Sequence, residues 1–335
     1  MGWMLEDPGD NCKAIINFHD NFWLFLQSTV PIAMKLHQLH ALVGVVEYGG
    51  IRAAARAMHL TQAALTKSLR QLEEDHGVAL LIRKSSGVSL TDAGQRLHAR
   101  AQLVVRQLDL AIEELEQAKG QDGGMVRVGL TPYLMLSGLG EAFHWFRKRF
   151  PRVELRVFEG LVTRVVPGLR DGSMDFAVVA DSGDLGSTEF DRVELLIESQ
   201  KLVVRAGHSV LMQPTAAKLR ALEWVLPGPY GTGMDEALLT MFEHAKVQPP
   251  DLLTRCDAMA AMALVRQSDA VCIMPAPLLA QPEGHGLVEL SLRSLKPPPV
   301  QLLQISLPGV PLSPAASYLA RCIREATVKK NEAPH

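Results

Sequence analysis

The sequence has few of the features that mark an enzyme, a secreted protein or a membrane protein. No stretch approaches the ~20 consecutive apolar residues that a membrane-spanning helix requires. Its 4 cysteines include no C-x-x-C pair, which speaks against a cysteine-based metal site. A Walker loop, a G-x-G-x-x-G turn after a strand, an H-E-x-x-H motif and a G-x-S-x-G elbow are all missing. We therefore expect no catalysis, no bound metal, no cofactor and no membrane segment.

The cysteines are Cys12, Cys256, Cys272 and Cys322. Without a secretory signal they are typical of reduced thiols, and we expect the protein to be cytoplasmic. Cys256 and Cys272 flank one expected helix, so a redox sensor is one interpretation. Burial in neighbouring strands is favoured over it, because free cysteine packs as a small hydrophobic side chain.

The stretch 50–90 has the pattern of two short helices followed by a hairpin. Residues 51–58 hold four alanines at helix-favouring positions, and Thr61 then offers a hydroxyl suited to capping a second helix. A tight turn at His59-Leu60 would join the two. In the second helix, leucines at i, i+4 and i+7 predict an inward apolar face of Leu65, Leu69 and Leu72.

The opposite face of the second helix carries Gln62, Thr66, Lys67 and Arg70. Gln and Arg form bidentate hydrogen bonds with adenine and guanine edges in the major groove, while Thr and Lys reach phosphates. The helix N-terminus adds its own attraction for phosphate. An ordinary solvated helix would also have a polar outer face, so this pattern alone leaves both interpretations open.

A basic hairpin is expected after the second helix. Residues 79–82 form an apolar, strand-like run, residues 88–90 alternate as a second strand, and a basic turn at 83–87 joins them. Between Arg52 and Arg106 there are nine Arg and Lys residues against four Asp and Glu residues, whereas the whole chain has a net charge of -2. This local excess is the electrostatic footprint of nucleic-acid binding. The expected DNA contacts are Arg52, Thr61, Gln62, Thr66, Lys67, Arg70, Arg83 and Lys84.

At these residues the sequence resembles the LysR-type transcriptional regulators. The family pattern is approximately A-A-x-x-L-x-x-(S/T)-Q-(P)-A-(aliphatic)-(S/T)-x-x-(aliphatic)-x-x-L-E, followed by L-G, L-(F)-x-R and L-T-x-x-G. The match keeps a fixed spacing from 54 to 94, which is far more specific than a short motif. The matching residues are Ala54, Ala55, Met58, Thr61, Gln62, Ala64, Leu65, Thr66, Leu69, Leu72, Glu73, Gly77, Leu80, Arg83, Leu90, Thr91 and Gly94.

Four positions depart from the family pattern. Ala63 stands where the family usually has proline, His76 where it has leucine, Leu81 where it has phenylalanine, and Gly50 where it has a serine cap. Loss of the proline removes some preorganisation of the recognition helix, and glycine is a less specific N-cap. We expect slightly weaker helix starts without loss of function.

The resemblance implies an α/β protein with an N-terminal winged helix-turn-helix, a long linker helix and a two-lobed α/β effector domain like a periplasmic binding protein. The expected domains are 34–90, 91–119 and 125–330. Regulators of this family usually start near Met34, so we favour translation from Met34, with residues 1–33 as a non-native extension. A real but poorly ordered extension is the alternative.

Two further helices are expected around the head. The helix at 36–46 would bury an apolar face of Leu36, Leu39, Val43 and Val46. The helix at 91–119 has apolar residues at alternating spacings of four and three, and this coiled-coil seam consists of Leu97, Ala101, Val104, Leu108, Ala111, Leu115 and Ala118. Packing of that helix on its own domain is the plain alternative. Dimerisation is favoured, because paired DNA half-sites need paired heads.

Strands and helices alternate after 120–124, a glycine-rich segment expected to break the linker helix and act as a hinge. A first βαβαβ unit is predicted by strands at 125–130, 153–158 and 174–180 with helices at 138–150 and 162–169. A second unit is predicted by strands at 194–206, 224–227, 252–256 and 271–274 with helices at 233–244 and 259–266. The chain then returns near Leu292 to a strand at 300–307 and a helix at 314–326. Lobe I would be 125–195 and 292–330, and lobe II 196–291.

Ligands of such sheets bind in the cleft outside the carboxyl ends of the strands. The expected effector contacts lie at those ends and are Thr131, Tyr133, Gly160, Thr163, Tyr230 and Thr232. Ordinary loop positions are the alternative for each of them. Threonines and tyrosines would suit a carboxylate or an aromatic metabolite. Ser268 and Ala270 replace a family pair of glycines, so the rear wall of the pocket is expected to differ from that of relatives.

The favoured function is a LysR-type regulator that binds double-stranded promoter DNA and responds to a small-molecule effector. The resemblance further implies a homodimer or homotetramer that bends promoter DNA and contacts RNA polymerase when it activates. A periplasmic-type solute-binding protein is the alternative, and the head, the basic excess and the missing signal peptide weigh against it. An enzyme with a DNA-binding appendage is a third interpretation, weakened by the lack of a catalytic set.

Overall fold

The computed structural model describes residues 34–84, 87–119, 123–181, 185, 189–228 and 233–332. The chain divides into two compact units, with the described residues up to Val105 in unit 1 and those from Arg106 onward in unit 2. The boundary between the two units therefore falls within the predicted linker helix. The predicted extension, residues 1–33, lies outside the described residues. Over the ranges just given, no helix combines the length and the apolar character needed to cross a membrane.

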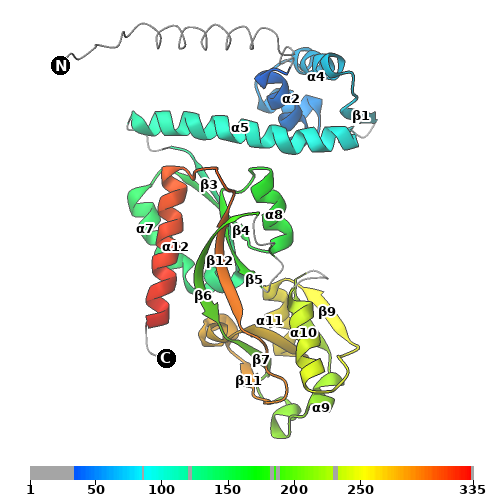
Figure 1. The fold of residues 1–335 in the computed structure, drawn as a ribbon, viewed down its shortest axis with the longest axis vertical. Helices are drawn as coiled ribbons and strands as arrows, with labels where there is room; N and C mark the ends of the chain where they lie inside the picture. The colour runs from blue at the N-terminus through cyan, green and yellow to red at the C-terminus, as the bar shows by residue number, and fades with distance from the viewer. Residues whose placement is uncertain are drawn as a thin grey trace, which may run out of the picture. The chain divides into compact units, whose positions relative to one another are not determined.

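Unit 1 is a winged helix-turn-helix, as the sequence predicted. Its elements are α2 (Leu36–Glu47), α3 (Ile51–Ala57), α4 (Gln62–His76), β1 (Leu81–Lys84), β2 (Gly87–Leu90) and the first part of α5 (Asp92–Ala118) (Figure 1). The predicted inward face of α4 is confirmed, since Leu65, Leu69 and Leu72 are at most 1% exposed. These leucines form one core with residues of α2, α3 and β1.

The apolar face predicted for α2 is confirmed at Leu39 and wrong at Leu36 and Val46. Leu36 and Val46 are 40% and 36% exposed. The buried residues of α2 are instead Gln38, Leu39, Ala41, Leu42, Gly44 and Val45. Leu39 packs with Ala101 and Val105 of α5, whereas Leu42 and Val45 pack in the core of the helix pair. Because α2 is covered on two sides, its buried surface is broader than the single stripe that the sequence suggested.

The hairpin begins later than predicted, and Arg83 and Lys84 belong to β1 and not to the turn. Lys84 pairs with Gly87, which leaves only residues 85 and 86 between the paired positions. Glu73 sets the start of the strand, because its Oε1 accepts the amide N–H groups of Leu80 at 2.8 Å and Leu81 at 3.0 Å. The two residues that the sequence assigned to a longer turn are therefore part of the strand ladder.

Lobe I of unit 2 is a five-stranded mixed sheet with helices on both faces. Its strands are β3 (Met125–Leu130), β4 (Glu154–Glu159), β5 (Phe176–Asp181), β6 (Asp191–Glu198) and β12 (Val300–Ser306), in the order β4-β3-β5-β12-β6. The helices are α6 (Pro132–Ser137), α7 (Leu139–Arg149), α8 (Val162–Arg170) and α12 (Pro314–Glu332). Helices α7 and α12 lie side by side over one face, and α8 covers the other (Figure 1).

Lobe II has a second five-stranded sheet. Its strands are β7 (Gln200–Arg205), β8 (Trp224–Pro227), β9 (Leu253–Cys256), β10 (Val271–Pro275) and β11 (Leu287–Leu290), in the order β11-β7-β10-β8-β9. The helices are η1 (Ser209–Met212), α9 (Ala216–Arg220), α10 (Gly233–His244), α11 (Ala258–Gln267), η2 (Ala276–Ala280) and η3 (Pro282–Gly284). Trp224 is fully buried beside Phe242 and donates its indole N–H to the carbonyl of Leu219 at 2.9 Å. Strand β11 and helices α6 and α9 had not been predicted.

The strand predicted at 194–206 is two strands in different sheets. Glu198 still pairs with Val300 in lobe I, while Gln200 pairs with Pro275 in lobe II. The crossing between the lobes therefore lies at Ser199, and the boundary predicted between 195 and 196 was slightly too early. The returning crossing lies between β11 and β12, where the sequence predicted it.

Candidate functional site

The second helix of unit 1 begins and ends as its sequence requires. The hydroxyl Oγ1 of Thr61 accepts the amide N–H of Ala64 at 3.1 Å and caps α4. Gly77 ends the helix with a φ of 63°, a left-handed conformation that suits glycine. Between α3 and α4 the turn passes through His59, whose φ is 56°. The helix pair is thus held in a defined geometry, and Thr61 satisfies one of the free backbone N–H groups in the first turn of α4.

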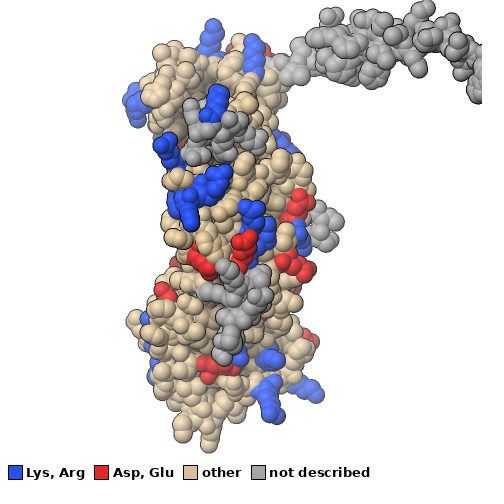
Figure 2. Space-filling view, turned by 90° about the vertical axis from the view of Figure 1, so that its left-hand side faces the viewer, with Lys and Arg blue, Asp and Glu red and all other residues tan. Residues whose placement is uncertain are grey.

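The outer face of α4 brings together the polar residues that the sequence singled out. Gln62, Lys67 and Arg70 are exposed and Thr66 is half-buried, and all four line one shallow surface groove. Arg52 is exposed on α3, and Thr61 is exposed at the cap. Figure 2, which views the molecule from the left-hand side of Figure 1, shows more blue than red in its upper part. The outer face of α4 has the charge and the hydrogen-bonding groups needed to bind DNA.

Unit 2 contains a cavity between its two lobes. It has a volume of about 180 Å³ and is enclosed by residues that follow β3 and β4 in lobe I and by residues of β8, β10, α10 and α11 in lobe II. Thr131, Tyr133, Gly160 and Thr163, predicted as effector contacts, all line it. Tyr230 and Thr232 lie outside the described residues. Ser268 and Ala270 lie outside the lining of this cavity, although they precede β10, which contributes to it.

Local packing fixes the lobe I wall of the cavity. The amide of Thr131 donates to the carbonyl of Val178 at 3.0 Å, and the hydroxyl of Thr131 caps α6. A Cβ added to Gly160 would lie 2.6 Å from the carbonyl carbon of Leu130 and 2.8 Å from the amide nitrogen of Thr131. Only glycine allows the end of β4 to approach β3 this closely, so the position predicted for ligand contact is also a structural requirement.

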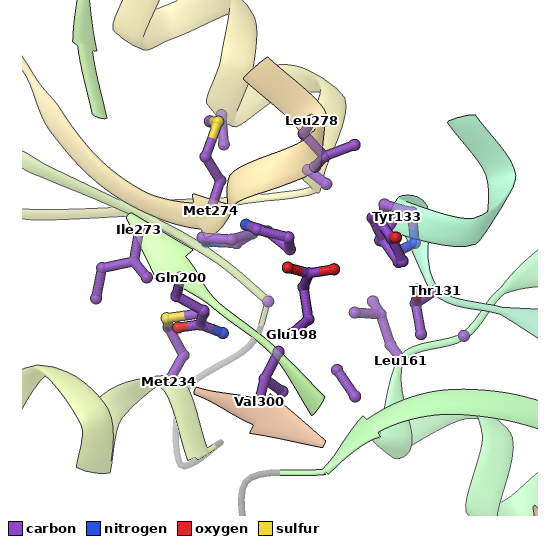
Figure 3. A pocket seen from close by; sticks show the side chains of 18 of the residues that line it. Thr131, Tyr133, Leu161, Glu198, Gln200, Met234, Ile273, Met274, Leu278 and Val300 are labelled. Atoms are coloured by element: carbon purple, nitrogen blue, oxygen red, sulfur yellow. The ribbon is translucent and has the colours of Figure 1, made fainter. Parts of the chain in front are cut away.

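Glu198 and Gln200 also line the cavity, and the sequence did not single them out. Glu198 is 9% exposed, and its Oε1 accepts the amide N–H of Ser199 at 2.9 Å. The hydroxyl of Tyr133 is hydrogen-bonded to Glu198. Burial and the negative charge of Glu198 raise the pKa of Tyr133, which therefore stays protonated and donates. Figure 3 shows the Glu198 carboxylate directed into the cavity on the side of Tyr133. A charged residue inside an apolar strand pattern was the available signal.

A buried ion-pair network joins α5 to lobe I. Arg106, on α5, is 6% exposed and contacts Asp175 at 2.8 Å and Glu113 at 3.1 Å. The same guanidinium donates to the carbonyl of Met125 at 3.2 Å. Burial alone would lower the pKa of Arg106, but the charges of Asp175 and Glu113 outweigh burial and raise it. The second carboxylate oxygen of Asp175 accepts the amide N–H of Arg127 at 2.7 Å, so one carboxylate ties the linker helix to the start of β3.

The cysteines of lobe II are weakly acidic. Cys272 is buried, and burial raises its pKa to about 12. Burial and the nearby Asp257 also raise the pKa of the half-buried Cys256. Neutral thiols are poor nucleophiles, which favours packing over redox sensing. Within the part of the chain that the structure describes, no three His, Cys, Asp or Glu side chains are grouped as metal ligands would be.

A helix-turn-helix with a basic outer face, joined to a two-lobed α/β domain with an internal cavity, defines a class of DNA-binding transcriptional regulators that respond to small ligands. Residues 36–95 match the family model for bacterial regulatory helix-turn-helix proteins of the lysR family, and residues 119–328 match the LysR substrate binding domain. The chain belongs to the LysR-type transcriptional regulators. A solute-binding protein for transport is not favoured, because the head matches as well as the two-lobed domain.

Known relatives support this assignment along most of the chain. The HTH-type transcriptional regulator TdcA of Escherichia coli (strain K12) is 25% identical over 264 residues, which cover 78% of this chain and 84% of TdcA. Full-length OxyR from Pseudomonas aeruginosa has a similar fold with a TM-score of 0.65, 20% identity and coverage of 87% and 95%. Full-length CbnR complexed with its target DNA gives a TM-score of 0.59, 24% identity and coverage of 88% and 100%.

Proposed function

We propose that this regulator reads a palindromic promoter site with the α4 helices of two copies of the chain. The exposed face of Gln62, Thr66, Lys67 and Arg70 is the observation that carries this proposal. In such a complex the Gln and Arg side chains hydrogen-bond to base edges, and the basic residues of the hairpin hold the phosphate backbone. The protein then works in the cytoplasm, without catalysis of its own.

The second half of α5 supports pairing between copies. Val104, Ile112 and Leu115 are 48%, 50% and 64% exposed, although they are large apolar side chains. Val104 and Leu115 belong to the heptad seam, whereas Leu97 and Ala101 of the same seam pack in unit 1 against α2. Two chains that pair along the exposed part of the seam would cover it. Association of such dimers into a tetramer, and contact with RNA polymerase during activation, extend the same proposal.

The cavity between the lobes is the effector site in this proposal. A bound molecule would contact both lobes, since the lining includes Thr131 and Gly160 from lobe I and Met234 and Met274 from lobe II. An effector changes regulation only through different affinities for two arrangements of the assembly. The cavity supports such a mechanism, because a ligand that fills it would contact walls from both lobes.

The direct test is fluorescence anisotropy of the purified protein with the DNA upstream of its own gene, at near-physiological salt and with a scrambled duplex as competitor. Each base contact contributes about 1 to 3 kcal/mol, so Gln62→Ala and Arg70→Ala should each weaken specific binding by about 5- to 150-fold. Arg293→Ala, which removes an exposed arginine from unit 2, is the matched control. Wild-type affinity in both α4 variants would show that the reading face is elsewhere.

A further inference from the structure

The polar part of the cavity is acidic. Its described lining includes Glu159 and Glu198 but no Lys, Arg or His residue. Residues 229–232, which precede α10, are Pro, Tyr, Gly and Thr and add no charged residue to the sequence there. The remaining described lining is mostly apolar, with methionine, leucine, isoleucine, valine, proline and alanine side chains. An anionic ligand would find no cationic side chain among the described residues of this wall.

Helix N-termini do not reverse this charge. The first turn of α8 lines the cavity and contributes a partial positive charge of about half a unit. Helix α11 also starts at the cavity, but Asp257 caps it by accepting the amide N–H of Ala260 at 2.8 Å. Helix α10 has Asp235 and Glu236 in its first turn. Helix α6, capped by Thr131, also begins at the cavity, and Asp235 of α10 is itself paired with Arg255. Among the described residues of the lining, the charged ones are Glu159 and Glu198, and both are acidic.

Glu198 is held where it can receive a cation. It ends β6 directly before the crossing at Ser199, and its carboxylate lies against Tyr133 (Figure 3). The amide of Ser199 and the hydroxyl of Tyr133 that contact it are neutral donors. A carboxylate that is 9% exposed is costly to desolvate unless a cation or further donors compensate it. A bound ammonium group would supply both the opposite charge and additional N–H donors.

We propose that the effector of this site carries a protonated amine on a compact apolar body. The amine binds the Glu198 carboxylate, and the apolar body packs on Met234, Ile273 and Met274 across the cavity. The cavity volume of about 180 Å³ limits the ligand to a small molecule. This proposal rests on the effector role proposed above, and it replaces the carboxylate that the threonines and tyrosines had suggested.

Three probes of nearly equal size and shape test the charge preference: benzylamine, benzyl alcohol and benzoate. Their dissociation constants are measured with the full-length protein by isothermal titration calorimetry at pH 7. We expect benzylamine to bind at least tenfold more tightly than benzyl alcohol and benzoate. Tighter binding of benzoate, or no binding of benzylamine up to its solubility limit, would overturn the proposal.

Variants locate the amine. Glu198→Gln keeps the shape of the side chain and should weaken benzylamine binding at least tenfold, while benzyl alcohol binding stays within twofold. Glu194→Gln is the matched control, because Glu194 lies exposed on the same strand outside the lining and should leave benzylamine binding unchanged. If Glu198 only ties β6 to α6, Glu198→Gln lowers the melting temperature without altering amine selectivity, and the proposal fails.

A second variant keeps the test valid if Glu198→Gln does not fold. Glu198→Asp keeps the negative charge on a shorter side chain, so benzylamine should still bind more tightly than benzoate; a variant that folds and has lost this preference would contradict the proposal. Promoter affinity, measured by anisotropy with each probe present, distinguishes failure of the amine proposal from failure of the proposed effector role. If benzoate alone shifts that affinity, the effector role stands and the amine proposal fails. If benzylamine binds through Glu198 but leaves promoter affinity unchanged, the amine site stands and the effector role fails.

Discussion

Replacing Asp175 with asparagine would remove the negative charge facing Arg106 while preserving the size of the side chain. The Arg106 and Asp175 side chains are only 7% and 5% exposed, so the guanidinium would stay buried next to a neutral amide. Glu113, at 3.1 Å and with a side chain 20% exposed, would still offset part of its charge. The asparagine oxygen could also still accept the amide N–H of Arg127.

The expected cost follows from these contacts. Removing one partner of a buried ion pair destabilises a protein by about 3–5 kcal/mol, and the remaining partners of Arg106 reduce the expected cost here to about 2–3 kcal/mol. Because the pair joins α5 to lobe I, the loss should concentrate in the second half of α5. At about 1.36 kcal/mol per factor of ten, amide exchange in residues 106–118 should become about 30- to 150-fold faster.

Hydrogen exchange followed by mass spectrometry measures this locally. Glu189→Gln is the matched control, since it neutralises one member of the Arg170–Glu189 pair, whose side chains are 57% and 42% exposed. An exposed pair contributes at most about 1 kcal/mol, so this control should change exchange little. Unchanged exchange in residues 106–118 of the Asp175 variant, or an equal change in the control, would refute the reasoning. Adding Arg106→Met to Asp175→Asn should recover part of the stability, because the Arg106 guanidinium is then no longer buried without its main partner.

Three further predictions concern DNA binding, assembly and cysteine chemistry. Lys84→Ala at the hairpin should weaken DNA binding for all sequences alike and reduce the slope of log affinity against log salt by about one unit; a sequence-selective loss would contradict a phosphate contact. Leu115→Asp, on the exposed part of the α5 seam, should shift sedimentation of the full-length chain toward the monomer, whereas dimers of unchanged stability would exclude this seam. With its pKa raised to about 12, Cys272 should remain protonated from pH 7 to 9 and resist iodoacetamide in the folded protein, and labelling as fast as in urea would disprove its burial.

The sequence located the elements whose apolar runs end at strong local signals. The bounds predicted for β3, β8 and α10 coincide with the observed ones. Glycine or proline stands at one end or both of each run, at Gly124 and Pro132 for β3, at Pro227 and Gly228 for β8 and at Gly233 for α10, and such residues interrupt a periodic pattern. The leucine face of α4 was equally clear, because residues spaced by four and three lie on the same face of a helix.

Tertiary contacts decided what the sequence did not reveal. The pattern of residues 194–206 continues through Ser199, yet the chain changes sheets there, because β12 and β10 offer pairing partners in different lobes. The two-sided burial of α2 depends on where α5 packs, and this contact has no local signature. The charge of Glu198 beside an apolar run was a local signal, but the sequence did not show what surrounds it. Its importance comes from Tyr133 and the cavity wall, which are close in space and distant in sequence.

The order of strands in lobe I also bears on how the chain folds during synthesis. Strand β12 lies between β5 and β6, although lobe II is translated between β6 and β12. At about 5–20 residues per second, the ribosome needs roughly 5 to 20 s to proceed from Ser199 to Ser306. Throughout that interval, the strand that must join β5 to β6 is missing, and α12, which completes the lobe I core, is made later still. Lobe II can close its own sheet first, so an incomplete lobe I with open strand edges is the nascent species most in need of a chaperone.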